Sequence, residues 1–451
     1  MKPKHYDVFV IGSGIAGQTT AEYCAKHGKS VAVADDREFG GTCANRGCDP
    51  KKVLMQFADI CHHIDNLQGL GIDEKPKINW KDVQKFKKQF TQDVPVNTEK
   101  NLKTIGIDLY HQSPKFIDEN TIEVEGERVT ADYFVIATGR VPRLLHFKGA
   151  QFLGTSDDVL NLKKVPKSAV FIGSGYVGME MAYLLSSLGS KVTVIDQGTH
   201  ALSQFDAFLT EKLVKSLEQR GITFIFEAQV ENIESLRKNL KVTYISKGEE
   251  HSIKARKVFN SAGRIPATER LQINNANIDA NGDGIAVNSF LQSVSNPKVY
   301  ACGDVASFGV PLTPLSGLQG HIVGKNIVEG NTKETKDRLV PSVVFTQPNI
   351  AMVGLSEDEA KSRYKNIKVY KGDASDWFSS KKINEDTYAY IIITNARTEE
   401  IVGGQLLSSH GNETINLLSL AIHQGLTVSE FQSLIFTYPS FTNDLKYMLS
   451  D

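Results

Sequence analysis

The chain carries one local pattern twice: an apolar strand, a glycine-rich turn, a helix, a second strand and an acidic residue. The first copy has the turn GSGIAG at residues 12–17, a helix over 16–26 and strands at 6–11 and 30–34. Such glycines let backbone N–H groups approach a pyrophosphate, and the acid accepts hydrogen bonds from ribose hydroxyls. The pattern predicts a dinucleotide-binding βαβ unit. The predicted contacts are Gly12, Gly14, Gly17 and Asp35.

The second copy begins with a strand at residues 169–172 and the turn GSGYVG at 173–178. A helix over 179–188 and a strand over 191–195 follow, and an aspartate again ends the pattern. In each copy a later strand also ends in a glycine turn. One such domain with a coincidental repeat would need too many matched elements, so the sequence predicts an α/β fold with two Rossmann-like domains. The further predicted contacts are Gly139, Gly173, Gly175, Gly178, Asp196 and Gly263.

The stretch GGTCANRGCDPKK at residues 40–52 contains Cys43 and Cys48, between a glycine pair and a proline that can open a helix. A loop that runs into a helix can bring two cysteines within the roughly 7 Å between Cα atoms that a disulfide needs. The helix N-terminus and the neighbouring Lys51 and Lys52 favour a reactive thiolate. This combination predicts a redox-active pair.

The same stretch has two alternative interpretations, a structural disulfide and half of a metal site. Zinc sites usually begin with a shorter cysteine spacing and need further ligands, and the chain has no second cysteine pair of that kind. His62 and His63 lie on the wrong side of the expected helix to complete such a site. We therefore predict redox chemistry here and no metal.

Charge and cysteine content restrict the class of protein. With 51 Lys and Arg against 52 Asp and Glu, the net charge of −1 gives no electrostatic basis for binding nucleic acid or an anionic membrane. No apolar stretch has the length of a signal peptide before the first strand, and none approaches a membrane span. The 5 cysteines are too few for a secreted disulfide scaffold of this size. We expect a soluble, cytoplasmic enzyme.

The remaining segments differ from the two repeats. Residues 73–107 indicate a charged helical insertion, and residues 298–304 indicate a strand that delivers Asp304 at a glycine turn. From residue 341 onward short strands alternate with turns. The last two expected strands, at 387–394 and 401–408, are separated by a turn and indicate an antiparallel meander. We predict that this region is an α+β module for association or substrate closure rather than a cofactor site. The expected elements are a helix at 316–329, strands at 342–346, 368–371, 387–394 and 401–408, and helices at 411–424 and 428–436.

With these elements in place, the chain resembles the pyridine nucleotide-disulfide oxidoreductases, the family of glutathione reductase, dihydrolipoamide dehydrogenase and mercuric reductase. Residues 40–52 match the family's redox motif, 12–17 its FAD turn and 173–178 its nicotinamide turn. The sequence CGD at 302–304 matches its second flavin motif, and 341–354 opens its interface domain. The implied domains are FAD-binding (1–150 and 265–338), NAD(P)-binding (151–264) and a homodimer-forming domain (339–451).

The resemblance also implies roles for individual residues. Hydride would pass from NAD(P)H to FAD, and from FAD to a Cys43–Cys48 disulfide that reduces a small oxidised substrate. Cys43 would be the interchange thiol and Cys48 the charge-transfer thiol. Lys51 would lie near the flavin and pair with Glu180, for which the alternative is a solvated helix charge. The remaining implied flavin and nicotinamide contacts are Thr42, Tyr176, Asp304 and Thr313.

The acid of the second repeat predicts the choice of nicotinamide. A carboxylate at Asp196 accepts hydrogen bonds from the ribose of NAD and repels a 2′-phosphate. Family members that use NADP place arginines just after this strand, whereas residues 197–200 contain none. Gly178 supplies the third glycine, where enzymes that prefer NADPH often have alanine. We predict NADH as the preferred donor.

The C-terminal motif departs from the family pattern. Where disulfide reductases carry a histidine and a glutamate that act as acid and base from the partner subunit, this chain has Tyr438 and Asn443. His321 replaces an arginine of glutathione reductase, Asp49 adds a negative charge beside Cys48, and no cysteine follows position 302. These changes favour oxidants whose leaving group is a stable anion: hypothiocyanite-like species, activated disulfides, quinones or a metal ion.

Three alternatives remain. In the first, water or Tyr438 would do the work of the histidine on an ordinary low-molecular-weight disulfide, or the activity would resemble that of dihydrolipoamide dehydrogenase or mercuric reductase. The protein would instead be an NADH oxidase or diaphorase whose cysteines do not take part in turnover. A non-catalytic FAD-binding scaffold is the third, and the intact second glycine turn with Tyr176 and Glu180 argues against it.

Overall fold

The computed structural model describes residues 3–336 and 339–450. The chain divides into two compact units, each of which combines segments that are distant in the sequence. The four segments predicted from the sequence, 1–150, 151–264, 265–338 and 339–451, divide the chain more finely than these two units, and that division stays a prediction. Unit 1 consists of residues 1–53, 85–143 and 264–338, and unit 2 of residues 54–84, 144–263 and 339–451.

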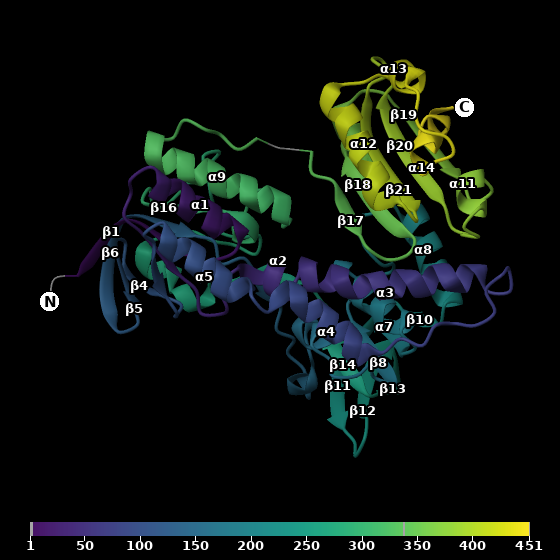
Figure 1. The fold of residues 1–451 in the computed structure, drawn as a ribbon, viewed down its shortest axis with the longest axis horizontal. Coiled ribbons are helices and arrows are strands. Elements are labelled where there is room, and N and C mark those ends of the chain that lie inside the picture. Colours follow the sequence, from purple (N-terminus) through teal and green to yellow (C-terminus); the bar gives the residue numbers. More distant parts are fainter. Residues whose placement is uncertain (1–2, 337–338, 451) are drawn as a thin grey trace. The chain divides into compact units, whose positions relative to one another are not determined.

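Unit 1 is built on a seven-stranded, mostly parallel sheet. Its strands are β1 (Lys4–Ile11), β2 (Val31–Ala34), β3 (Asp108–Tyr110), β4 (Lys115–Asp118), β5 (Thr121–Val124), β6 (Glu127–Ile136) and β16 (Val299–Ala301). The order is β3-β2-β1-β6-β5-β4, and β16 pairs with β6. The central strands are buried on both faces and therefore read as continuous apolar runs. Helices α1 (Ile15–Lys26) and α9 (Thr313–Glu329) lie side by side and share one apolar core with this sheet (Figure 1).

Unit 2 contains a second, smaller parallel sheet. Its strands are β8 (Ser168–Ile172), β9 (Lys191–Ile195), β10 (Ile222–Ile225) and β14 (Lys257–Asn260). Their order is β10-β9-β8-β14, and helix α7 (Tyr176–Ser187) connects β8 to β9. A three-stranded antiparallel sheet of β11 (Ala228–Ser235), β12 (Leu240–Ser246) and β13 (Glu249–Ala255) is inserted before β14. The two predicted Rossmann-like units are thus confirmed.

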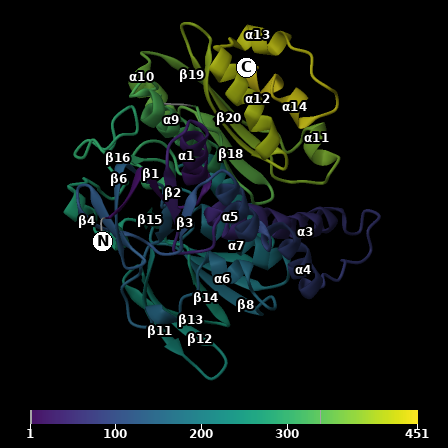
Figure 2. The ribbon, with the colours of Figure 1, turned by 60° about the vertical axis from the view of Figure 1, so that its left-hand side comes forward.

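The last part of unit 2 is an antiparallel sheet, as the meander pattern predicted. Its strands are β17 (Ser342–Val344), β18 (Asn349–Gly354), β19 (Ile367–Asp373), β20 (Ala389–Asn395) and β21 (Ile401–Ser408). Their order is β17-β18-β21-β20-β19, and α12 (Gly411–Gln424) packs along β18 and β21 (Figures 1 and 2). The sequence analysis missed β18, the short run between a proline and a glycine. The other helices here are α10 (Glu357–Arg363), α11 (Phe378–Lys381), α13 (Val428–Ser433) and α14 (Phe441–Asp444).

Several predicted helices have different bounds in the structure, and α13, predicted over 428–436, ends at Ser433. Helix α9 begins at Thr313, three positions before the predicted start, because Pro314 suits the first turn of a helix. Helix α7 begins at Tyr176 because the glycine turn leads directly into it. Residues 73–79 are not helical, and the insertion is two helices, α4 (Trp80–Thr91) and α5 (Val94–Thr104). In the described part of the chain, no helix combines the length and the apolar character that a membrane span requires.

Candidate redox site

Cys43 and Cys48 lie in unit 1, where a short helix meets a long one. Cys43 is inside α2 (Gly41–Arg46), and Cys48 is the first residue of α3 (Cys48–Leu67). The prediction of a loop before the long helix is therefore wrong around Cys43, because that segment is helical. Gly47 separates the two helices with φ −131° and ψ −116°. Both cysteines carry free thiols and are hydrogen-bonded to each other.

Helix α2, which carries Cys43, packs directly on the first glycine turn. Gly41 has φ +71°, and a Cβ atom there would lie 2.4 Å from the Cα atom of Gly14. The two backbones can approach this closely only because both residues are glycines. The glycine pair in front of Cys43 therefore serves to place the thiols beside the turn GSGIAG.

The two thiols differ in charge. The pKa of Cys48 is lowered to about 6. The largest cause is the hydrogen bond that Cys43 donates to its sulfur. Burial opposes this shift, whereas Lys51, Lys52 and the Thr313 hydroxyl support it. The same hydrogen bond, together with burial, raises the pKa of Cys43. The shared proton is therefore favoured on Cys43 and the negative charge on Cys48.

Two arginines that the sequence analysis missed anchor Asp304. Arg264 Nη1 donates to Asp304 Oδ2 at 3.2 Å, and Arg140 Nε donates to the Asp304 carbonyl oxygen at 2.9 Å. The segments that begin with these arginines, 140–142 and 264–266, pair as antiparallel strands. In the sequence each arginine directly follows a glycine, as Gly139-Arg140 and Gly263-Arg264, in the turn after the later strand of each repeat.

The first glycine turn has the form that a dinucleotide requires. Gly12 has φ +109°, and a Cβ atom there would lie 2.4 Å from the carbonyl oxygen of Ala137. Helix α1 starts after Gly14 without a side-chain cap, so its first N–H groups face outward as donors for an anion. Asp35 Oδ2 accepts from the N and Oγ atoms of Ser13 at 2.8 and 2.6 Å. These residues fit the pyrophosphate and ribose of FAD.

The second glycine turn repeats this arrangement in unit 2. Asp196 Oδ2 accepts from the N and Oγ atoms of Ser174 at 2.6 and 2.7 Å, and Oδ1 accepts from Gly198 N at 2.7 Å. Helix α7 starts after Gly175, again without a side-chain cap. The serine after each first glycine fixes the carboxylate, a role that the sequence analysis did not assign.

Tyr176 and Glu180 both lie on α7. The hydroxyl of Tyr176 is 2.7 Å from Ser342 Oγ. Glu180 is 2% exposed, and its Oε1 accepts a hydrogen bond from Phe345 N at 2.9 Å. The alternative interpretation of Glu180 as a solvated helix charge is therefore wrong. Its partner Lys51 belongs to unit 1, and the Lys51–Glu180 pair stays a prediction.

The C-terminal substitutions lie in unit 2. Tyr438 is 74% exposed, whereas Asn443 is buried within α14. In unit 1, His321 lies on α9, and the edge of its ring packs against Tyr23 at 5.0 Å between ring centroids. Thr42 is exposed next to Cys43.

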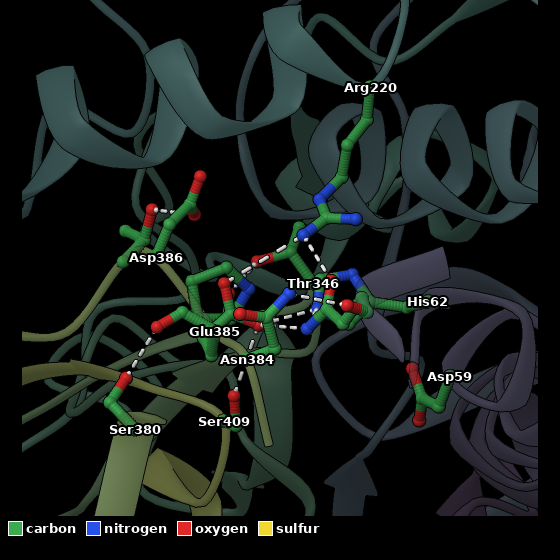
Figure 3. A network of polar contacts seen from close by, with 12 residues as sticks. Asp59, His62, Arg220, Thr346, Ser380, Asn384, Glu385, Asp386 and Ser409 are labelled. Carbon is green, nitrogen blue, oxygen red and sulfur yellow. Dashed lines mark hydrogen bonds and ion pairs between the residues drawn. The ribbon is translucent and has the colours of Figure 1, made fainter. Parts of the chain in front are cut away.

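The second half of α3 takes part in a buried polar network that the sequence did not suggest (Figure 3). His62 Nε2 lies 2.6 Å from Glu385 Oε2, and both side chains are 1% exposed. Asn66 Nδ2 donates to the same carboxylate oxygen at 3.2 Å, and Arg220 Nη2 lies 3.8 Å from Glu385 Oε1. His62 thus pairs with a carboxylate. Across residues 3–336 and 339–450 no group of three or more His, Cys, Asp or Glu side chains is arranged to hold a metal ion.

Two family profiles match the chain. The one described as pyridine nucleotide-disulphide oxidoreductase matches residues 6–320, and the one described as its dimerisation domain matches residues 340–449. The first covers both dinucleotide-binding sheets and the redox segment. The second covers the antiparallel sheet and the helices that follow it.

Individual relatives agree with these profiles. The chain is 30% identical to mercuric reductase of Lysinibacillus sphaericus, over 98% of this chain and 82% of the relative. It is 29% identical to glutathione reductase of Burkholderia cepacia, over 98% of each chain. Among solved structures, it is similar to a Cu(II) complex of the HOCl-induced flavoprotein disulfide reductase RclA from Escherichia coli. That match has a TM-score of 0.86 and 26% identity over 98% of each chain.

Proposed function

The chain belongs to the pyridine nucleotide-disulphide oxidoreductases, and from this premise we propose that it uses NADH to reduce a Cys43–Cys48 disulfide, which in turn reduces a small oxidant. Members of this family are FAD-dependent oxidoreductases that use a pyridine nucleotide, so the chain is an enzyme of this class. The dimerisation profile supports a homodimer. The observation that carries the proposal is the placement of two free thiols where α2 meets α3, beside the first glycine turn.

Residues of both units have assigned parts in holding the cofactors. The turn around Gly12 and Gly14, with Asp35, would hold the adenosine and pyrophosphate of FAD, and Asp304 and Thr313 its ribityl chain and ring. Bound FAD supplies the two-electron connection between a nicotinamide and a disulfide. Tyr176 and the second glycine turn would receive the nicotinamide. The uncapped helix N-termini and fixed carboxylates support these assignments.

The thiols perform the last redox step. A sulfur–sulfur bond forms between Cys43 and Cys48, and the pair loses two electrons and the proton held by Cys43. The oxidant takes the electrons. Contact with a small molecule is supported by the partial exposure of Cys43, the thiol assigned to the oxidant.

The preferred oxidant is one that needs no proton donor. A phenol is a poorer acid and base at neutral pH than an imidazole, so Tyr438 of the partner subunit is a weak replacement for the histidine. A leaving group that is a stable anion avoids this step. Turnover of NADH against a panel of hypothiocyanite, an activated aromatic disulfide, a quinone and glutathione disulfide tests the proposal, and fast turnover of glutathione disulfide alone would contradict it.

Copper(II) is a second candidate oxidant, because the RclA structure is a copper(II) complex. Each Cu(II) ion takes one electron to become Cu(I), so the dithiol would reduce two ions as its disulfide forms. The ion needs no proton, which agrees with the loss of the histidine. Anaerobic NADH oxidation with a Cu(I)-specific chelator as reporter tests this candidate, and we expect two Cu(I) for each NADH.

Restoring the imidazole tests the role of position 438. We expect Tyr438→His to raise turnover of glutathione disulfide, because a positioned acid–base group contributes about 10²–10⁴-fold and even partial placement should give tenfold or more. Turnover of an oxidant with an anionic leaving group should change little. Steady-state kinetics with both substrates measure the two effects, and Tyr438→Phe is the matched control. An unchanged ratio of the two activities would contradict the proposal.

The NADH preference rests on Asp196. We expect Asp196→Ala to raise the KM for NADH by roughly tenfold or more, because a hydrogen bond to a charged group contributes about 1.5–3 kcal/mol. The same change should narrow the gap between NADH and NADPH, because it removes the charge that repels a 2′-phosphate. Steady-state kinetics with both donors give the comparison. A wild-type preference for NADPH, or unchanged NADH kinetics in the variant, would overturn it.

A further inference from the structure

The N-terminus of α9 meets the redox pair. Thr313 is the first residue of α9, and its Oγ1 lies 3.8 Å from the Sγ atom of Cys48. The same hydroxyl also hydrogen-bonds to Cys43. The first turn of α9 has neither a side-chain cap nor an acidic residue. Because Cys48 is itself the first residue of α3, two positively polarised helix ends come together at one sulfur.

The fixed charges around the two cysteines favour negative charge on Cys48 rather than on Cys43. Lys51 and Lys52 favour negative charge on Cys48. Asp49 disfavours it on Cys43, the thiol that would meet the oxidant. These groups stabilise the resting form but oppose the form in which Cys43 is the nucleophile. The Thr313 hydroxyl differs from them, because a hydroxyl hydrogen rotates and can serve either sulfur.

We propose that Thr313 is a catalytic residue: its hydroxyl donates to whichever of the two sulfurs is anionic, so that the thiol pair and Thr313 together move the proton that a histidine moves in glutathione reductase. This inference deepens the proposed function and rests on it. It assigns the lost acid–base role to groups within one subunit.

The step is a proton transfer without electron transfer. The proton leaves Cys43 Sγ and passes along the existing hydrogen bond to Cys48 Sγ, and the negative charge moves to Cys43. The Thr313 hydroxyl turns from Cys48 to Cys43 and stabilises the new thiolate. Cys43 then reacts with the oxidant, and the proton on Cys48 remains available to leave when the disulfide forms.

Thr313→Val removes the hydroxyl and keeps the shape of the side chain, whereas Thr313→Ser keeps the hydroxyl. Anaerobically reduced holoenzyme is alkylated with iodoacetamide across a pH series, and mass spectrometry identifies the modified cysteine. We expect the midpoint for Cys48 to rise by roughly one pH unit in the valine variant, because a hydrogen bond to a charged group is lost. Turnover of the best oxidant should fall about tenfold by the same loss at Cys43. The serine variant should match the wild type in both.

Thr19→Val, at a helical threonine of α1 whose hydroxyl bonds only to Ile15 O among the described contacts, is the matched control and should change neither reading. Superimposable alkylation curves for Thr313→Val and the wild type would overturn the inference. A shifted curve with unchanged turnover would also overturn it, because the hydroxyl would then act only on the resting form. A shifted curve in an enzyme that turns over no oxidant of the panel would instead contradict the proposed function.

Discussion

Replacing Cys43 with serine is expected to abolish electron transfer to the oxidant while leaving NADH-driven flavin reduction intact. The side chain that meets the oxidant would lose its sulfur, and a serine cannot form a disulfide with Cys48. Removing an essential nucleophile closes the covalent route, so we expect turnover to fall by more than about 10³-fold. Stopped-flow flavin absorbance and steady-state NADH oxidation separate the two half-reactions.

Cys61→Ser is the matched control for this variant. Cys61 lies on the same helix as Cys48, 13 positions further along the chain, and carries a half-buried free thiol. We expect its replacement to leave both half-reactions near the wild-type rates. If Cys43→Ser keeps its turnover, electrons leave the flavin directly and the protein is an oxidase or diaphorase.

The largest expected loss of stability follows from breaking the pair of His62 and Glu385. Both side chains are 1% exposed, and His62 Nε2 lies 2.6 Å from Glu385 Oε2. Removing one partner of a buried ion pair leaves the other charge desolvated and uncompensated, which costs about 3–5 kcal/mol. We therefore expect Glu385→Gln to lower the free energy of unfolding by about this amount while preserving the side-chain volume.

The chain provides a specific probe for this measurement. Its 2 tryptophans, Trp80 and Trp377, both belong to unit 2, as do His62 and Glu385. Urea unfolding followed by tryptophan fluorescence therefore reports on the unit that contains the network. The exposed pair Lys381–Asp376 in the same unit, with N and O atoms 3.1 Å apart, is the control, and Asp376→Asn should cost less than about 1 kcal/mol. Equal losses for the buried and the exposed variant would contradict the prediction.

The same pair predicts a pH dependence. Burial opposes ionisation of Glu385, but the hydrogen bond and charge of His62, with Arg220, outweigh it and lower the pKa of Glu385 in the folded state. A carboxylate with a depressed folded pKa contributes stability fully above its unfolded pKa of about 4.3 and loses it as the pH falls further. The difference in stability between the wild type and Glu385→Gln should therefore shrink when the pH is lowered below about 4.

Local sequence determined the two dinucleotide turns and the location of the redox pair. A strand, a turn of the form GSG-x-x-G, a helix and a strand lie next to each other in the chain, so the backbone conformation that glycine permits at Gly12 is encoded within a few residues. The cysteine motif is local for the same reason. These features also carried the family resemblance, which the two family profiles confirm.

Tertiary structure decided which groups surround those motifs. Thr313 reaches Cys48, Arg264 reaches Asp304 and Glu385 reaches His62, although long stretches of chain separate the members of each pair. Periodicity and local spacing carry no information about such pairs, because each depends on how a sheet and its helices fold together. The charge asymmetry of the thiols has the same origin: the sequence named both cysteines, and the folded surroundings raise the pKa of Cys43 and lower that of Cys48.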